Sequence, residues 1–103
     1  MTWSVAGRAT RDLLAILDEI EAVAGPATAE RYALRFKTCL SRIADRPRSG
    51  APRPGLGEYA RIMIVRPYVF IYDHDAGADT TIVLRVLHSR RNVTERLLRR
   101  PRP

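Results

Sequence analysis

The spacing of apolar residues predicts two amphipathic helices in the first half of the chain. In residues 9–23 apolar side chains recur every three or four positions, which places them on one helical face. They are Ala9, Leu13, Ile16, Ile20 and Val23. The same spacing returns at Ala29, Ala33, Phe36, Leu40 and Ile43. Gly25 and Pro26 lie between the two sets, and since Gly favours a helix end and Pro a helix start, the pattern predicts a helical hairpin.

Beyond residue 58 the pattern changes to the two-residue period of strands. Three segments are rich in β-branched and aromatic residues, as strands are, and they cover residues 59–65, 68–72 and 80–88. Arg66-Pro67 and the turn-forming residues 73–79 separate them, which predicts three antiparallel strands joined by hairpins. In the last strand, alternation predicts that one apolar set faces the helices, namely Ile82, Leu84 and Val86.

The remaining segments complete a single α+β domain. Trp3 and Val5 alternate with polar residues and predict a short opening strand at a sheet edge. Residues 46–58 are rich in Pro, Gly and Arg and predict a basic, exposed loop. A short C-terminal helix with one apolar edge is predicted by Val93, Leu97 and Leu98, and a frayed tail by residues 101–103. The order β-α-α-β-β-β(-α) over residues 1–103 indicates a helical hairpin packed on a small antiparallel sheet.

Charge is distributed unevenly along the chain. The formal net charge is +7. Residues 1–45 carry six basic and six acidic side chains, whereas residues 46–103 carry twelve arginines against five acidic side chains. Because a polarised positive field attracts anions, this asymmetry predicts a polyanionic or acidic partner for the second half.

The composition favours a soluble, cytoplasmic protein. Apolar residues make up 46% of the chain, and no apolar run approaches the roughly 18–20 residues of a membrane span. The N-terminus lacks the basic and apolar regions of a signal peptide. Cys39 has no second cysteine to pair with, so the fold does not require an oxidising compartment. Its position one turn before Ile43 indicates a packing role rather than a nucleophile.

The residues that could bind a ligand or partner are mainly arginines. The three predicted strands contain no carboxylate, which argues against paired-carboxylate catalysis. His74 and His88 lack the spacing partners of a zinc site, and the glycines of residues 50–57 do not form a phosphate-binding loop, so neither a metal nor a cofactor is predicted. Basic side chains instead gather in the predicted sheet and just beyond it, where they can grip phosphates or carboxylates. They are Arg61, Arg66, Arg85, His88, Arg90 and Arg91.

Five segments in this order resemble the RelE/ParE toxins. Residues 9–16 resemble the A-x-x-D-L-x-x-I of their first helix, and residues 25–32 resemble the start of their second. Residues 46–54 are similar to their P-x-x-G-x-x-R-P loop. Arg61 followed by residues 68–72 is similar to their central strands, and residues 85–91, RVLHSRR, resemble the R-V-L-H-x-x-R signature. The resemblance therefore covers nearly the whole chain.

This resemblance implies the toxin of a bacterial type II toxin–antitoxin pair. RelE-type members cut mRNA on the ribosome with basic residues and a C-terminal tyrosine, whereas ParE-type members poison DNA gyrase. This chain has no tyrosine after Tyr72, and Glu95, Arg96 and Leu97 stand near its expected place. None of these side chains replaces a phenolic proton donor well, and residues 46–58 contain no lysine. These departures favour the ParE branch and a toxin that is not an enzyme.

Three interpretations stay open at this point. The first is a gyrase inhibitor neutralised, in a hetero-oligomer, by a ParD-like antitoxin whose acidic and apolar C-terminal segment wraps the helices and covers the sheet. The second is an endoribonuclease in which Arg61, Arg85 and Arg90 stabilise phosphate charge and His88 shuttles a proton. The third is a degenerate toxin that acts only as a repressor partner of its antitoxin. The residues predicted to contact the target or the antitoxin are Arg61, Arg85, His88, Arg90 and Arg91.

Overall fold

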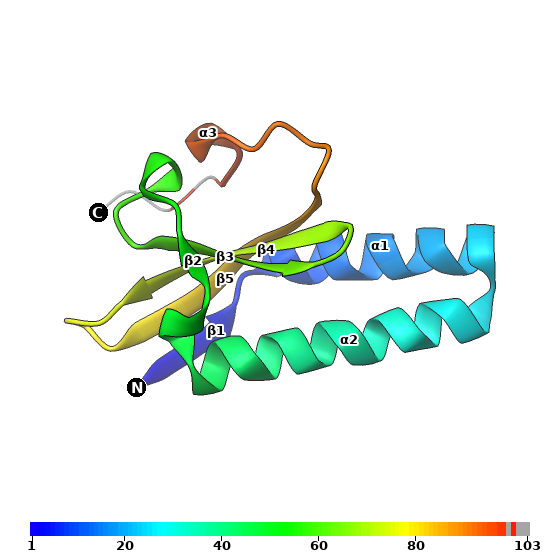
Figure 1. Cartoon of the computed structure of the whole chain (residues 1–103), viewed down its shortest axis with the longest axis horizontal. Coiled ribbons are helices and arrows are strands. Elements are labelled where there is room, and N and C mark those ends of the chain that lie inside the picture. Colours follow the sequence, from blue (N-terminus) through cyan, green and yellow to red (C-terminus); the bar gives the residue numbers. More distant parts are fainter. Residues whose placement is uncertain (99, 101–103) are drawn as a thin grey trace.

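The computed structural model of the chain describes residues 1–98 and 100. It confirms the α+β prediction: a hairpin of two long helices lies against one face of a five-stranded sheet, and a short C-terminal helix lies on the other side (Figure 1). The tail predicted at residues 101–103 lies outside the described residues. Within residues 1–98 and 100, no helix has the length and apolar character needed to cross a membrane.

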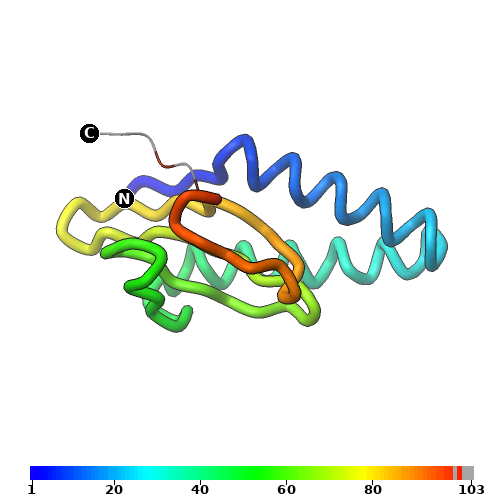
Figure 2. Tube along the Cα trace, turned by 90° about the horizontal axis from the view of Figure 1, so that it is seen from above, coloured from blue at the N-terminus to red at the C-terminus, as the bar shows by residue number. Residues whose placement is uncertain are grey.

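The helical hairpin consists of α1 (Gly7–Ala24) and α2 (Pro26–Asp45). Gly25 joins them with a φ of 90°, a left-handed conformation that glycine adopts without steric cost, and Pro26 opens α2 as predicted. Figure 1 and Figure 2 show that the end of the hairpin around Gly25 extends beyond the sheet. Val23 is therefore 82% exposed although it lies on the predicted apolar face.

The sheet contains β1 (Thr2–Val5), β2 (Ala51–Pro52), β3 (Ala60–Val65), β4 (Tyr68–Asp75) and β5 (Thr80–His88), in the order β1-β5-β4-β3-β2. The opening strand lies at an edge, as predicted. It runs parallel to β5, however, so the sheet is mixed and the prediction of a wholly antiparallel sheet was wrong in this detail. Side chains alternate in the same way in parallel and antiparallel strands, and the sequence pattern therefore carried no information on direction.

A β-bulge in β5 reverses part of the predicted inward face. Ile71 of β4 pairs with Arg85 and Tyr72 pairs with Val83, so Leu84 is an extra residue without a partner. The bulge shifts the alternation by one position, and Val83 and Val86 both pack against the helices. The prediction was correct for Val86 and wrong for Ile82 and Leu84, which pack on the opposite face of the sheet.

The C-terminal segment covers this opposite face. It includes α3 (Glu95–Leu98), and Leu98 is buried against Ile71, Leu84 and Leu87. The predicted apolar edge of this segment is confirmed, because Val93 and Leu97 join the same cluster. Both faces of the sheet are therefore packed, one by the hairpin and one by the chain's own C-terminal segment (Figure 1).

Strand β4 is longer than predicted and carries carboxylates. It continues to Asp75, so Asp73 and Asp75 lie in the strand rather than in the turn. The Asp73 carboxylate accepts two hydrogen bonds from the Arg100 guanidinium, at 2.7 and 2.8 Å. An ion pair at the end of the sheet thus offsets the low strand propensity of Asp73.

The loop predicted at residues 46–58 contains three short elements. Two 3₁₀ turns, Pro47–Ser49 and Pro54–Leu56, flank the two-residue edge strand β2. This strand was not predicted, since its Pro52 favours a loop and fits a sheet only at an edge.

Candidate functional site

Arg85 lies at the junction between α1, β5 and the C-terminal segment. Its Nε and Nη2 donate to the two carboxylate oxygens of Asp12 in α1 at 2.7 and 3.1 Å, and its Nη1 donates to the carbonyl of Leu97 at 3.1 Å. The backbone N–H of Val86 also donates to Asp12, at 3.0 Å. Arg85 is only 6% exposed. This guanidinium therefore ties three segments together inside the protein, and its charge is matched by a carboxylate.

Arg61 also makes internal contacts. Its Nη1 donates to the carbonyl oxygens of Arg48 and Gly50, at 3.0 and 2.7 Å. Beside it, the Tyr72 hydroxyl donates to the Pro47 carbonyl at 2.6 Å and accepts from the Gly50 N–H at 2.9 Å. Burial raises the pKa of Tyr72, which keeps its hydroxyl protonated and able to donate. Together, two side chains of the sheet hold the loop that precedes β2.

Glycine is required at position 50 by this close approach. A Cβ there would overlap the Tyr72 hydroxyl oxygen and would lie 2.7 Å from the backbone oxygen of Ile62. Both approaches are closer than real Cβ contacts. The glycine of the proline-rich loop therefore lets the backbone reach the sheet.

His88 lies where β5 reaches the helical hairpin. Its ring contacts Tyr68 edge to face at a centroid distance of 5.7 Å, and Tyr68 contacts Tyr32 of α2 in the same way at 6.0 Å. Burial raises the pKa of the Tyr68 hydroxyl, so this group remains neutral. The three rings form one wall of a groove with a volume of about 570 Å³. We call this the hairpin groove.

The opposite wall of the hairpin groove is the protruding part of α1. Ile16, Ile20 and Val23 line it, with Glu19 on the same helix. The groove exists because the hairpin extends past the sheet, so that none of the strands in the described part of the chain covers the inner faces of both helices there (Figure 1). It combines apolar walls with aromatic and charged groups, which is typical of a surface that binds another polypeptide.

Arg90 and Arg91 are exposed, and their backbone is held by the end of the sheet. The N–H of Arg90 donates to Nδ1 of His88 at 3.1 Å, and the N–H of Arg91 donates to the His88 carbonyl at 2.9 Å. Ser89 is anchored to the Pro67 carbonyl by a bond of 2.8 Å. Arg91 lines the hairpin groove together with His88. Of the five predicted site residues, His88, Arg90 and Arg91 thus lie together. Arg85 borders a cavity with Arg91, but its guanidinium is bound to Asp12 and Leu97. Arg61 is bound to the proline-rich loop.

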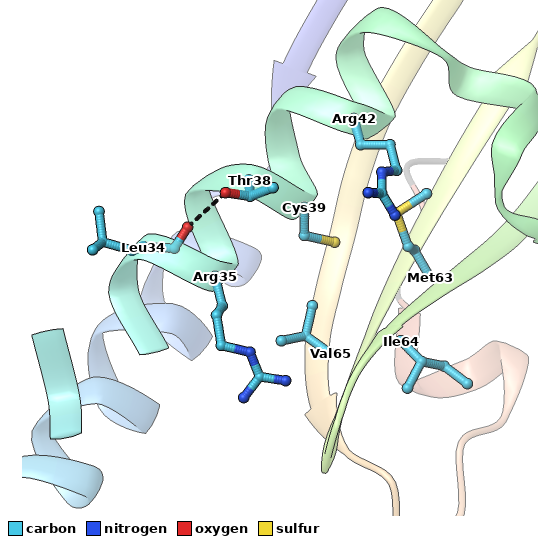
Figure 3. A pocket seen from close by; sticks show the side chains of 8 residues that line it. All are labelled: Leu34, Arg35, Thr38, Cys39, Arg42, Met63, Ile64 and Val65. Carbon is cyan, nitrogen blue, oxygen red and sulfur yellow. Dashed lines mark hydrogen bonds between the residues drawn. The ribbon is translucent and has the colours of Figure 1, made fainter. Parts of the chain in front are cut away.

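A second, smaller groove separates α2 from the outer part of the sheet. Its volume is about 330 Å³, and it is lined by Leu34, Arg35, Cys39, Arg42, Met63 and Val65, among others (Figure 3). β4 pairs with β3 along its whole length, but β2 pairs with the other edge of β3 at Arg61 and Ile62. Within the described residues, no strand therefore pairs with that outer edge at Met63–Val65. This groove was not predicted, because it depends on where a two-residue strand ends.

Cys39 and His74 lie in surroundings that serve packing and internal hydrogen bonding. Burial raises the pKa of the Cys39 thiol to about 12, and the residue packs in the core, so the predicted packing role is confirmed. Nδ1 of His74 lies 2.9 Å from the Thr81 hydroxyl. Among the residues that the structure describes, no three His, Cys, Asp or Glu side chains gather in a way that could hold a metal ion.

Comparison with known families identifies the family of this chain. The sequence model described as "ParE toxin of type II toxin-antitoxin system, parDE" matches residues 4–93. The chain belongs to this family. It is therefore a type II toxin of the ParE/RelE superfamily, and the match covers the Asp12–Arg85 junction, His88, Arg90 and Arg91.

Two solved structures share the fold of this ParE-family toxin. The chromosomal ParDE toxin–antitoxin system from P. aeruginosa is similar with a TM-score of 0.71 and 20% identity, covering 85% of this chain and 95% of that chain. The RelBE2 toxin–antitoxin complex from Mycobacterium tuberculosis is similar with a TM-score of 0.59 and 22% identity, covering 84% and 88%. No curated protein matches the sequence.

Two partners of the predicted site residues were missed in the sequence. Asp12 flanks the apolar stripe of α1, four residues before Ile16, and an acid in that position signals a buried ion pair. Tyr68 was predicted to lie in a strand and to offer a stacking or hydroxyl contact, but its partner His88 was not identified. Its contact with His88 depends on the register between β4 and β5, in which the two residues are opposite each other.

Proposed function

We propose that this ParE-family toxin inhibits DNA gyrase and is neutralised in the cytoplasm by a ParD-like antitoxin. The observation that carries the proposal is the engagement of Arg61 and Arg85 in internal contacts. Cleavage of RNA requires cations that converge on one phosphate beside a proton donor and acceptor. Here Arg85 is neutralised by Asp12, and Arg61 is bound to loop carbonyls. Inhibition by binding requires no such convergence.

The antitoxin fits the hairpin groove. The partner proposed from the sequence has an acidic and apolar C-terminal segment, and the groove offers Ile16, Ile20 and Tyr32 for apolar side chains. Arg91 at its rim offers a charge for a carboxylate. The similar structures from P. aeruginosa and M. tuberculosis are themselves of toxin–antitoxin systems, which supports a hetero-oligomer. His88, Arg90 and Arg91 are the residues proposed to contact the antitoxin or the target.

The test measures the two candidate targets side by side. Expression without the antitoxin is expected to halt growth, and the purified toxin is expected to inhibit supercoiling of a relaxed plasmid by gyrase. Toxin saturated with antitoxin is the matched control and leaves supercoiling unchanged. Normal supercoiling together with ribosome-dependent cuts in mRNA would replace gyrase with the ribosome as the target. Normal growth with intact antitoxin binding would identify a degenerate toxin.

A further inference from the structure

The two ring nitrogens of His88, which lines the hairpin groove, have different surroundings. The backbone N–H of Arg90 donates to Nδ1 of His88 at 3.1 Å. A backbone N–H is always a donor, so Nδ1 is the unprotonated nitrogen of the neutral ring, and the proton lies on Nε2. The contact with Arg90 therefore fixes the tautomer of His88 and places an N–H group at Nε2.

The Nε2–H group of His88 is available to a partner. In the part of the chain that the structure describes, it donates no hydrogen bond. The residue that carries it is held on two sides, because its ring contacts Tyr68 edge to face at a centroid distance of 5.7 Å and its carbonyl accepts the N–H of Arg91 at 2.9 Å. A donor on a fixed ring loses little conformational freedom when it binds an acceptor. His88 thus offers one directed hydrogen bond to a segment in the hairpin groove.

The charges near His88 favour a neutral acceptor over a carboxylate. Two acidic residues line the hairpin groove. One of them is paired with an arginine, whereas Glu19 has no ion pair with another described residue. Burial raises the pKa of the neighbouring Tyr68 hydroxyl, and Glu19 raises it further, so the negative potential of Glu19 reaches this wall of the groove. A backbone carbonyl carries no net charge and avoids this repulsion, while a carboxylate fits better beside Arg91.

We propose that His88 donates a hydrogen bond from Nε2 to a backbone carbonyl of the antitoxin segment that occupies the hairpin groove. The identity of this partner rests on the proposed function. The two nitrogens of the ring have separate tasks: Nδ1 holds the turn that carries Arg90 and Arg91, and Nε2 contacts the partner. Because the acceptor belongs to the backbone, the contact fixes the position of the bound segment, and recognition of its charge is left to Arg91.

The tautomer is tested first, on the full chain without a partner. The chain contains two histidines, so His74→Asn leaves His88 as the single imidazole. Nitrogen–proton correlation spectra of the ring at about pH 8, where an imidazole is neutral, show which nitrogen carries the proton. We expect the proton on Nε2. A proton on Nδ1 would overturn the proposal, whether or not the chain binds an antitoxin.

Two substitutions separate the tasks of the two nitrogens. His88→Asn keeps an acceptor near the position of Nδ1, since Asn side chains accept from the N–H two residues on, but it does not reach the position of Nε2. His88→Gln places an amide near Nε2 and loses the acceptor near Nδ1. Both remove the ring and its contact with Tyr68, so each is the control for the other. Hydrogen exchange at the Arg90 amide is expected to stay slow in His88→Asn and to become faster in His88→Gln.

Affinity is measured by calorimetry with the antitoxin that restores growth to cells expressing this toxin. His88→Asn is expected to weaken binding about three- to tenfold, as the loss of one hydrogen bond requires, and His88→Gln is expected to bind more tightly than His88→Asn. His74→Asn is the matched control, because Nδ1 of His74 lies 2.9 Å from the Thr81 hydroxyl and the residue is outside the hairpin groove. Parent-like affinity in the folded His88→Asn variant would overturn the proposal, as would weaker binding by His88→Gln.

The chemical nature of the acceptor is tested by double-mutant cycles. His88→Asn is combined in turn with neutralisation of each carboxylate of the antitoxin, and additive losses are expected if the acceptor is a backbone carbonyl. Coupling of more than about threefold with one carboxylate would overturn that assignment. Failure of the proposed function has a different signature, namely growth that no antitoxin restores, and the ring spectrum of His88 then still decides the tautomer on which this inference stands.

Discussion

Arg85 and the pair Arg90–Arg91 belong to one short segment of the chain but lie in opposite environments. Arg85 is buried, and its guanidinium makes three hydrogen bonds to α1 and the C-terminal segment. Arg90 and Arg91 are exposed beyond the end of β5, and within residues 1–98 and 100 it is their backbone N–H groups, not their guanidinium groups, that make hydrogen bonds. A buried arginine that is paired with a carboxylate fixes the relative positions of chain segments. An exposed arginine adds to the positive electrostatic potential around the protein and is accessible to a partner. Residue type alone does not distinguish these roles.

The largest effect on stability is expected when the buried ion pair between Arg85 and Asp12 is broken. Arg85→Ala leaves the Asp12 carboxylate without its cation at a site where both side chains are largely buried, 7% and 16% exposed. We expect the free energy of unfolding to fall by about 3 kcal/mol, measured by urea denaturation.

A paired change separates lost charge from lost packing. Arg85→Met with Asp12→Asn removes both charges and keeps an acceptor for the Val86 N–H, so it is expected to be more stable than Arg85→Ala alone. Arg96→Ala, at an exposed position, is the matched control and is expected to change stability by less than about 0.5 kcal/mol. A loss for Arg96→Ala as large as for Arg85→Ala would remove the distinction between buried and exposed arginines.

A smaller effect is expected where the sheet holds the proline-rich loop. Tyr72→Phe removes the hydrogen bonds to Pro47 and Gly50 and leaves the buried Gly50 N–H without a partner. The expected cost is about 1–3 kcal/mol, with faster hydrogen exchange at the Gly50 amide. Tyr59→Phe changes a hydroxyl on a side chain that is 44% exposed and is expected to have little effect. Unchanged exchange at Gly50 in the Tyr72 variant would show that the loop is held by Arg61 instead.

The sequence was sufficient for the elements that depend on local periodicity. The two helices, the Gly25–Pro26 junction and the three long strands follow from the spacing of apolar residues and from turn chemistry, both of which act over a few neighbouring positions. The bulge at Leu84 does not, because it depends on pairing with β4. One extra residue reversed the faces of Ile82 and Leu84, and it also set the position from which Arg85 reaches Asp12.

In the candidate site, too, the sequence predicted what depends on neighbouring residues and missed what depends on tertiary contacts. Clustering in the sequence correctly brought His88, Arg90 and Arg91 together, since they are neighbours along the chain. It did not reveal that Arg61 donates hydrogen bonds to a loop, or that Arg85 pairs with Asp12 on a helix distant in the sequence. Nor did it reveal that Arg8 lies near Arg91 and Arg96. Such contacts arise only when tertiary structure places remote segments side by side.

We expect that the exposed arginines act on a partner and that the buried one acts on the fold. It is tested most directly by colony formation after induction of Arg90→Ala with Arg91→Ala, with circular dichroism and thermal melting on the same variant. We expect the Arg90/Arg91 variant to melt close to the temperature of the parent chain and to lose toxicity, whereas Arg31→Ala with Arg66→Ala remains toxic. Full toxicity in the folded Arg90/Arg91 variant would contradict the claim.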